Sequence, residues 1–157
     1  KKETSTEAVD VAGVIEECAA MLKSEADKKN VSIHINSRGN NLFINASRNR
    51  IKQMLINLID NGIKYNVSGG GILISVYKNA GWLIMKVKDT GIGIPEEHLP
   101  RIFERFYRVD KGRSRSMGGT GLGLSIVKHI VNLYNGDIKV QSRPGAGTEF
   151  IIRFPAL

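Results

Sequence analysis

The chain has 157 residues, 41% hydrophobic and 24% charged, which fits one globular domain and excludes a disordered or fibrous protein. Its formal net charge of +8 at pH 7 favours an anionic partner, and charge alone leaves nucleotide phosphates, nucleic acid and acidic lipid open. Cys18 is the single cysteine, so no disulfide or thiolate metal site can form within the chain, and no apolar run reaches the length of a membrane span.

The first predicted elements are a short strand over residues 6–9 and a helix after Asp10, which is placed to cap it. This helix should end near residues 28–30 and should turn an apolar face to the core: Val14, Ile15, Cys18, Ala19, Met21 and Leu22. Residues 31–35 alternate between apolar and polar, and residues 42–44 follow a turn at 38–41. We expect these two segments to pair as a hairpin.

A helix over residues 48–66, with Ser47 as its N-cap, is the most informative element. Its apolar face comprises Ile51, Met54, Leu55, Leu58 and Ile59. Beside that face, Asn57, Asn61 and Lys64 fall within about 60° of one another. An amide oxygen suits Mg²⁺, and a lysine one turn further can neutralise a phosphate held by the same ion. From this helix alone, asparagines that simply tolerate the surface are an equally good interpretation.

The second half of the chain predicts a hairpin of residues 72–77 and 82–87, and a short helix that Pro95 opens and that runs through residue 103. Residues 105–118 lack periodicity and carry five basic side chains, which indicates a mobile cationic loop. A helix then follows the glycine-rich residues 118–124 and ends at Gly136, before an antiparallel pair over 137–142 and 148–154. This order predicts an α+β fold, a two-layer sandwich with a mixed, mostly antiparallel sheet and three main helices on one face.

Two glycine-containing motifs are candidate ligand sites. Asp89 stands at a strand end before Gly91 and Gly93, where the backbone can come close to a ligand and an ionised carboxylate can accept from an adenine amino group. The alternative for Asp89 is an ordinary turn aspartate. Residues 119–123 open a helix whose free amides and positive dipole end suit phosphate. They match neither a Walker A loop nor a dinucleotide fingerprint, since Leu124 stands where the third glycine should be.

Four segments, at residues 57–65, 89–94, 102–110 and 119–124, together closely resemble the N, G1, F and G2 boxes of the catalytic ATP-binding domain of bacterial two-component sensor histidine kinases. The phosphate-regulon sensor type is the subfamily that they resemble most. The resemblance covers nearly the whole chain and implies one domain over residues 1–157 with the Bergerat (GHKL) fold. It also implies ATP and Mg²⁺ as cofactors, and a lid at about 105–118 that closes over ATP.

The resemblance assigns roles by position. Asn61 would be the Mg²⁺ ligand, with Asn57 close by on the same face, and Asp89 would bind the adenine amino group. Asn57, Lys64 and Arg108 would form the catalytic set, the last two by contacting phosphates. The remaining nucleotide contacts would be Tyr65, Gly91, Gly93, Ile94, Ile102, Tyr107, Lys111, Gly119, Thr120, Gly121, Leu122, Gly123, Leu124 and Thr148. Thr148 would reach adenine through water. Gly62 replaces the alanine more usual in the family.

The resemblance also implies what lies outside this chain. These kinases phosphorylate a histidine on a separate dimerisation domain, in a His-Glu-Leu/Phe-Arg-Thr-Pro context, and His34, His98 and His129 lie in other contexts. We therefore expect an excised, monomeric, cytoplasmic nucleotide-binding half that binds ATP but does not autophosphorylate alone. Its partners would be the missing dimerisation domain and, through the full-length kinase, a response regulator. The parent would be a membrane-anchored sensor, with no membrane contact by this domain.

Three other functions remain as alternatives. A related ATP hydrolase would place a glutamate four residues before the metal-binding asparagine, where this chain has Asn57. A basic nucleic-acid-binding module would need interleaved aromatic residues, which are missing here. A degenerate domain that binds nucleotide only for regulation would be expected to lack one of the four boxes.

Overall fold

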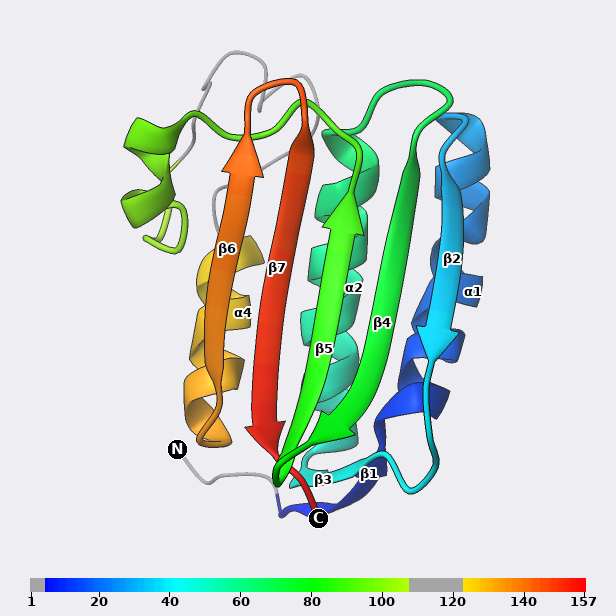
Figure 1. Ribbon diagram of the computed structural model, residues 1–157, viewed down its shortest axis with the longest axis vertical. Coiled ribbons are helices and arrows are strands. Elements are labelled where there is room, and N and C mark those ends of the chain that lie inside the picture. Colours follow the sequence, from blue (N-terminus) through cyan, green and yellow to red (C-terminus); the bar gives the residue numbers. More distant parts are fainter. Residues whose placement is uncertain (1–4, 108–122) are drawn as a thin grey trace.

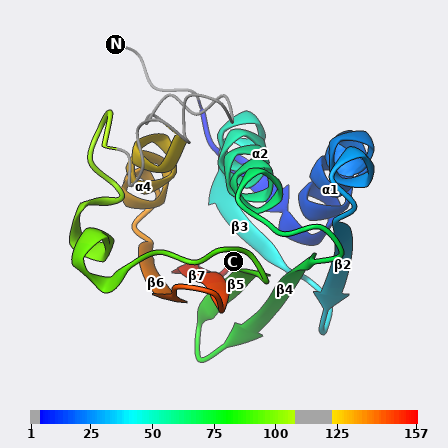
Figure 2. The same cartoon turned by 90° about the horizontal axis from the view of Figure 1, so that it is seen from above.

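Three helices lie against one face of a five-stranded sheet in the computed structural model, which describes residues 5–107 and 123–157 (Figures 1 and 2). The sheet order is β2-β4-β5-β7-β6, with strands β2 (Ser32–Ser37), β4 (Gly71–Asn79), β5 (Trp82–Asp89), β6 (Asp137–Arg143) and β7 (Gly147–Pro155). The helices are α1 (Val11–Lys28), α2 (Arg48–Lys64) and α4 (Gly123–Leu133), and η1 (Glu96–Arg101) is a short 3₁₀ helix. The predicted α+β sandwich is confirmed.

The predicted hairpin between residues 31–35 and 42–44 is wrong. β2 instead pairs in parallel with β4, and β3 (Phe43–Ala46) pairs with β1 (Glu7–Asp10) in a separate two-stranded sheet. The parallel register sets Ile33 beside Ile72 and Ile35 beside Ile74, so that the apolar side of β2 extends the face that the helices cover. Alternation in the sequence reveals that a strand has a buried side, but it does not identify the neighbouring strand.

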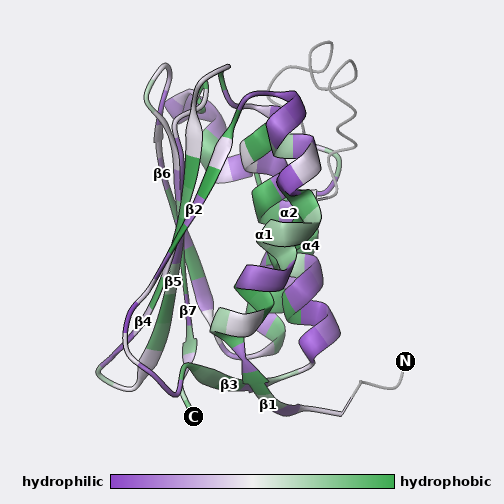
Figure 3. Cartoon of the chain, turned by 90° about the vertical axis from the view of Figure 1, so that its right-hand side faces the viewer, coloured by the Kyte–Doolittle hydropathy of each residue, from purple (hydrophilic) through white to green (hydrophobic). Residues whose placement is uncertain are grey.

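The core lies between the sheet and the helices, where Figure 3 shows the hydrophobic residues gathered. The apolar face predicted for α2 is confirmed, since all five of its residues are buried. Across from it, the inner positions of β5 and β7 are also buried: Leu83, Met85, Val87, Phe150, Ile152 and Phe154. On α1, Met21 was expected in the core but is 52% exposed. The buried stripe drifts around α1 toward Leu22 and Ala26, which leaves Met21 at its edge.

The helix ends follow the sequence with two differences. Asp10 caps α1 as predicted, its carboxylate accepting from Gly13 N. Ser47 has the extended backbone of an N-cap, but its side chain makes no capping bond to α2. At the end of α4 the left-handed residue is Asn135 (φ 62°), while Gly136 N donates to Val131 O. Gly136 is needed for space, because a Cβ there would lie 2.4 Å from Arg153 O.

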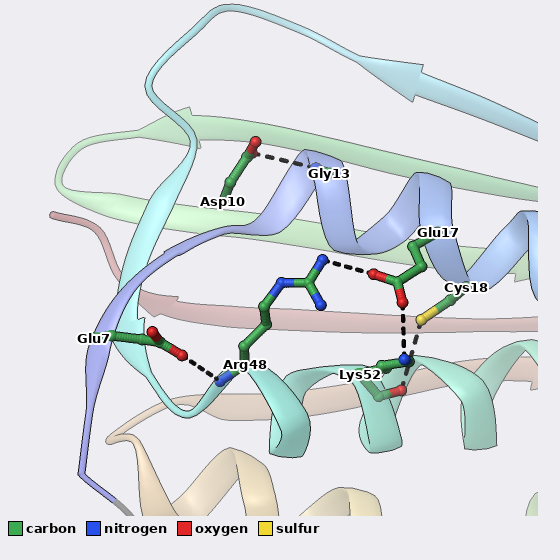
Figure 4. A network of polar contacts seen from close by, with 7 residues as sticks. All are labelled: Glu7, Asp10, Gly13, Glu17, Cys18, Arg48 and Lys52. Atoms are coloured by element: carbon green, nitrogen blue, oxygen red, sulfur yellow. Dashed lines mark hydrogen bonds and ion pairs between the residues drawn. The ribbon is translucent and has the colours of Figure 1, made fainter.

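Polar contacts join α1 to α2 at the start of α2 (Figure 4). The Glu17 carboxylate binds the Arg48 guanidinium at 2.6 Å and the Lys52 ammonium at 2.8 Å. Glu7 accepts from the Arg48 backbone N–H at 3.4 Å, which satisfies one of the free amides of the first turn. The Cys18 thiol donates to Lys52 O, and burial raises the pKa of that thiol to about 11. This network joins α1 to the first turns of α2, at the end of α2 that lies at the bottom of Figure 1.

The opposite face of the sheet is left uncovered by the described elements. Its aromatic residues are partly covered by cations, with the Arg38 guanidinium 4.3 Å from the Tyr77 ring centroid and that of Arg153 4.1 Å from the Trp82 ring centroid. An antiparallel sheet with one solvated face commonly has such a surface. In the part of the chain that the structure describes, no helix has the length and apolar character needed to cross a bilayer.

Candidate functional site

Segments far apart in the sequence meet at the upper end of the molecule in Figure 1, where α2 and β5 end and β7 begins. The start of α4 lies lower down, beside the middle of α2. The loop after β5 joins the end of α2 through Ile92 N, which donates to Tyr65 O at 3.0 Å. β5 joins β7 through Thr148 N, which donates to Asp89 Oδ1 at 3.2 Å. A third contact joins α2 to the first residue of α4. The structure thus brings together segments from three of the four predicted boxes and the Thr148 region.

Asp89 is buried at the end of β5, and no cationic side chain of residues 5–107 or 123–157 pairs with it. Its Oδ1 accepts from Gly91 N at 2.9 Å and from Thr148 N at 3.2 Å. Burial raises the pKa of the Asp89 carboxyl above its usual value, although the two backbone bonds oppose this shift. Its other oxygen, Oδ2, makes no hydrogen bond within the described residues. Asp89 therefore offers an acceptor oxygen to a ligand that carries a hydrogen-bond donor.

The glycines after Asp89 are required by close contacts within the protein. A Cβ on Gly91 would lie 2.3 Å from Tyr65 O, and one on Gly93 (φ 76°) would lie 1.8 Å from Arg143 O. We expected these glycines to let the backbone approach a ligand. In the structure their close approach is to the backbone of the α2 end and of the β6–β7 turn. They therefore fix the place of the loop that follows Asp89.

Asp89 and Thr148 both contribute to the lining of a cavity of about 870 Å³. The other walls come from η1 and from the ends of β5, β6 and β7: Lys88, Glu96, Leu99, Gln141, Ser142, Arg143, Pro144, Ala146, Gly147 and Glu149. None of the polar residues predicted on α2 lines this cavity. The cavity is therefore not the whole of the predicted nucleotide site.

The polar edge of α2 faces the start of α4. Asn57 donates from its side-chain nitrogen to Gly123 O at 3.4 Å, a long hydrogen bond. The Asn61 side chain makes no hydrogen bond within the described residues, which leaves its amide oxygen available to a ligand. Lys64 forms an ion pair with Asp60 at 3.1 Å, and both side chains are about one-third exposed. The sequence analysis did not single out Asp60.

Several predicted contact residues take part in the packing of the domain. Ile102 is buried in the core, while Ile94 and Leu124 are partly buried against it. Tyr107 lies against η1, where its hydroxyl is hydrogen-bonded to the His98 ring and its own ring lies 4.4 Å from the Arg101 guanidinium. These positions hold η1 and α4 in place.

The other predicted site residues lie outside the described ranges: Arg108, Lys111, Gly119, Thr120, Gly121 and Leu122. Nearly all of the predicted lid lies outside them too. Within the described ranges, no three His, Cys, Asp or Glu side chains gather as a metal site built from protein groups alone would require.

Asn66 and Thr90 were missed by the sequence analysis. The buried Asn66 side chain accepts from Val67 N and Thr90 Oγ1 and donates to Gly71 O, and Thr90 Oγ1 accepts from Gly71 N at 2.9 Å. This network ties the end of α2 to the start of β4 and to the residue after Asp89. In the sequence, Asn66 precedes a glycine-rich break and reads as an ordinary turn residue, so its burial had no local signal.

The family model that describes histidine kinase-, DNA gyrase B- and HSP90-like ATPases matches residues 46–157. The sensor-like histidine kinase SenX3 of Mycolicibacterium smegmatis is 39% identical over 149 residues, which are 95% of this chain and 38% of that protein. The chain thus spans well under half the length of this relative.

Three solved structures resemble the fold. The nucleotide-free catalytic domain of histidine kinase ThkA has a TM-score of 0.85 at 29% identity and covers 98% of this chain and 97% of its own. Full-length ShkA in complex with AMPPNP has a TM-score of 0.85 at 29% identity and covers 99% of this chain and 32% of its own.

ThkA in complex with the response regulator TrrA has a TM-score of 0.79 at 27% identity and covers 97% of this chain and 42% of its own. Matches of sequence and of fold thus lead to one group of proteins. The chain belongs to the histidine kinase-, DNA gyrase B- and HSP90-like ATPase family, within which it is an ATP-binding catalytic domain of the histidine kinase type.

Proposed function

We propose that this domain binds Mg²⁺ and ATP and supplies the γ-phosphoryl group to a histidine on a separate helical domain of a larger sensor kinase. The observation that carries the proposal is the arrangement around Asp89, a buried carboxylate whose Oδ2 has no hydrogen-bond partner among the described residues and can accept from a ligand. An adenine amino group is a donor that fits this oxygen. The neighbouring Thr148 completes the adenine end of the site.

The phosphate end of the site would lie along the polar edge of α2. Mg²⁺ prefers oxygen ligands and usually keeps several waters together with substrate phosphates, so one or two amide oxygens are a fitting protein contribution. Asn61 meets this requirement, since its side chain has no other hydrogen bond within the described residues. When bound, the ion would neutralise charge on the phosphates. Lys64 and Arg108 would supply further positive charge, and Lys64 would then be shared between a phosphate and Asp60.

The chemistry of this domain would be positioning and charge neutralisation. In-line phosphoryl transfer needs no covalent step on the protein that binds ATP. Asn57 cannot act as a general base, and in this structure its amide holds the start of α4. A domain without a carboxylate at this position would activate water poorly, so the phosphoryl group would be kept for the incoming imidazole.

The partners follow from the same assignment. The phosphoacceptor histidine would belong to the parent protein's dimerisation domain, because His34, His98 and His129 do not lie in the context expected of an acceptor. ThkA, which this chain resembles in fold, is in complex with a response regulator in one solved structure. We extend this to the present protein and place a response regulator downstream of it. The domain would work in the cytoplasm, where ATP is abundant, as part of a membrane-anchored sensor.

Calorimetric titration of ATP in the presence and absence of Mg²⁺ tests the phosphate end of the site. We expect Asn61→Ala to remove most of the gain in affinity that Mg²⁺ provides. Asn49→Ala, an exposed asparagine in the first turn of the same helix, should leave that gain unchanged. Equal Mg²⁺ dependence in all three proteins would show that Asn61 is not the ligand.

Incubation with labelled ATP tests the transfer. The isolated domain should form little phosphohistidine, and adding the parent's histidine-containing helical domain should allow it to form. Strong labelling of the isolated domain would contradict the proposal. Vigorous ATP hydrolysis by the isolated domain would instead favour the hydrolase alternative.

A further inference from the structure

The Ser142 hydroxyl sits at the centre of a hydrogen-bond network on the wall of the cavity near Asp89. Its oxygen lies 2.9 Å from Gly147 O, 2.8 Å from Ile94 N and 2.8 Å from Thr148 Oγ1. Ser142 and Thr148 both line the cavity. Three partners within normal hydrogen-bond distance are as many as one hydroxyl can hold, because it has one proton and two lone pairs.

The direction of each bond follows from this count. Gly147 O is a carbonyl and can only accept, so it takes the Ser142 proton. Ile94 N–H can only donate, so it uses one lone pair of Ser142. The remaining bond must use the second lone pair, and Thr148 must therefore donate its proton to Ser142. The reverse direction would leave two oxygen acceptors, Ser142 Oγ and Gly147 O, facing each other at 2.9 Å without a proton.

Thr148 thus has no hydroxyl proton left for a ligand and can only accept. It is also held beside the carboxylate, since Thr148 N donates to Asp89 Oδ1. Asp89 Oδ2 can only accept as well when it is ionised. This corner of the cavity therefore presents two acceptor oxygens, on Thr148 and Asp89, and no side-chain donor from these two residues.

We propose that Ser142 is a positioning residue for nucleotide selectivity: by taking the Thr148 proton it keeps that hydroxyl an acceptor, so that the corner selects a 6-amino purine over a 6-oxo purine. The inference rests on the proposed function, because it concerns the same adenine end of the site. A 6-amino group carries two N–H donors, which can bind the two acceptor oxygens directly. A 6-oxo group presents an acceptor to two acceptors, which leaves polar groups unpaired in a buried corner.

The test is the ratio of dissociation constants for ITP and ATP, measured by calorimetry on the whole domain. ITP differs from ATP by a 6-oxo group and the proton on N1. Removing the Ser142 hydroxyl frees the Thr148 proton to meet an oxo group, so Ser142→Ala should lower the ITP/ATP ratio about five- to tenfold. Ser75→Ala, on the uncovered face of the same sheet, is the matched control and should leave the ratio unchanged.

A double-mutant cycle separates positioning from general structural damage. Thr148→Val alone should lower the ratio to a similar extent, and Ser142→Ala should have no further effect on the ratio in the Thr148→Val background. If Ser142 only holds the Ile94 loop, both dissociation constants will rise together and the ratio will stay at the wild-type value. That result would overturn the inference.

If Ser142→Ala does not fold, Thr148→Val must lower the ratio while Thr148→Ser keeps it, and any other pattern overturns the inference. Failure of the proposed function has a different signature, namely no ATP binding by the wild type or unchanged ATP affinity in Asp89→Asn. Either of these results would overturn the inference as well, whereas an unchanged ratio in Ser142→Ala overturns the inference alone.

Discussion

Glu17 and Asp89 are carboxylates in opposite situations. Glu17 lies near the start of α2, where Lys52 and Arg48 bind both of its oxygens, and these hydrogen bonds lower the pKa of its carboxyl (Figure 4). Asp89 is buried near the other end of α2, beside Gly62, and within the described residues it is bound by backbone N–H groups alone. Burial raises the pKa of the Asp89 carboxyl.

Ionisation of these two carboxylates therefore changes the stability of the fold in opposite directions. Glu17 stabilises the fold above the usual glutamate pKa, and this contribution is lost as the pH falls through its lowered value. Asp89 is ionised at a cost in stability at neutral pH, and protonation relieves that cost as the pH falls through its raised value. A buried acid whose pKa is raised by desolvation is a candidate for a ligand site, whereas a paired surface acid stabilises the fold.

Asp89→Asn should give the largest effect. An amide can keep its oxygen toward Gly91 N and Thr148 N and would then place its NH₂ where Oδ2 accepts from adenine. ATP affinity should fall by about ten- to one-hundredfold, the value of a hydrogen bond to a charged group. The melting temperature should stay the same or rise, because a buried charge is removed. Calorimetry measures the change in ATP affinity, and thermal denaturation measures the change in melting temperature. The control is Asp137→Asn, which removes a surface ion pair with Arg153.

The pH dependence of ATP binding should show a second, smaller effect. Wild-type affinity should fall on acidification with a midpoint above about 3.9, the usual aspartate pKa, because a protonated Asp89 presents a donor instead of an acceptor. The phosphates of ATP titrate equally for the wild type and Asp89→Asn, so the ratio of their affinities isolates the carboxyl group. A ratio that does not change with pH, measured by nucleotide fluorescence titration, would count against ionised Asp89 as the adenine acceptor.

Glu17→Gln should have a modest effect on stability and none on the site. The melting temperature should fall slightly at neutral pH, because two ion pairs with Arg48 and Lys52 are weakened. The difference from the wild type should shrink on acidification, when Glu17 itself becomes neutral, and at high salt. ATP affinity should be unchanged. A loss of ATP affinity in this variant would mean that the two ends of α2 are coupled.

Gly62→Ala should have the smallest effect. Alanine favours the helix by up to about 1 kcal/mol, but its Cβ would lie 3.1 Å from Ile72 Cδ1, the flexible end of a core side chain, and 3.7 Å from Asp89 Cβ. We expect a gain in unfolding free energy of less than about 1 kcal/mol and unchanged ATP affinity, measured by denaturant unfolding and calorimetry. A clear loss of stability would show that the contact with Ile72 outweighs helix propensity.

Local patterns were sufficient for most elements of the fold. The periodicity of α2 and its buried face, the β4–β5 hairpin and the β6–β7 pair all follow from short stretches whose turns and apolar spacing leave little choice. Patterns were insufficient where two distant segments meet. β2 has one buried side whichever strand it joins, and Met21 keeps helical spacing although the stripe on α1 has moved away from it.

For the candidate site too, some features follow from the sequence and others depend on the folded structure. The sequence alone predicted which residue types would carry the chemistry, because these motifs are local: an amide pair and a lysine on one helix, an aspartate at a strand end and glycines around them. Tertiary structure alone decided that backbone amides take Asp89 Oδ1 while Oδ2 has no partner among the described residues, and that Lys64 already pairs with Asp60. It also decided the three bonds of Ser142, from which we infer that Thr148 donates its proton to Ser142. Hydrogen-bond partners and burial depend on segments that only folding brings together, so no single stretch of sequence contains them.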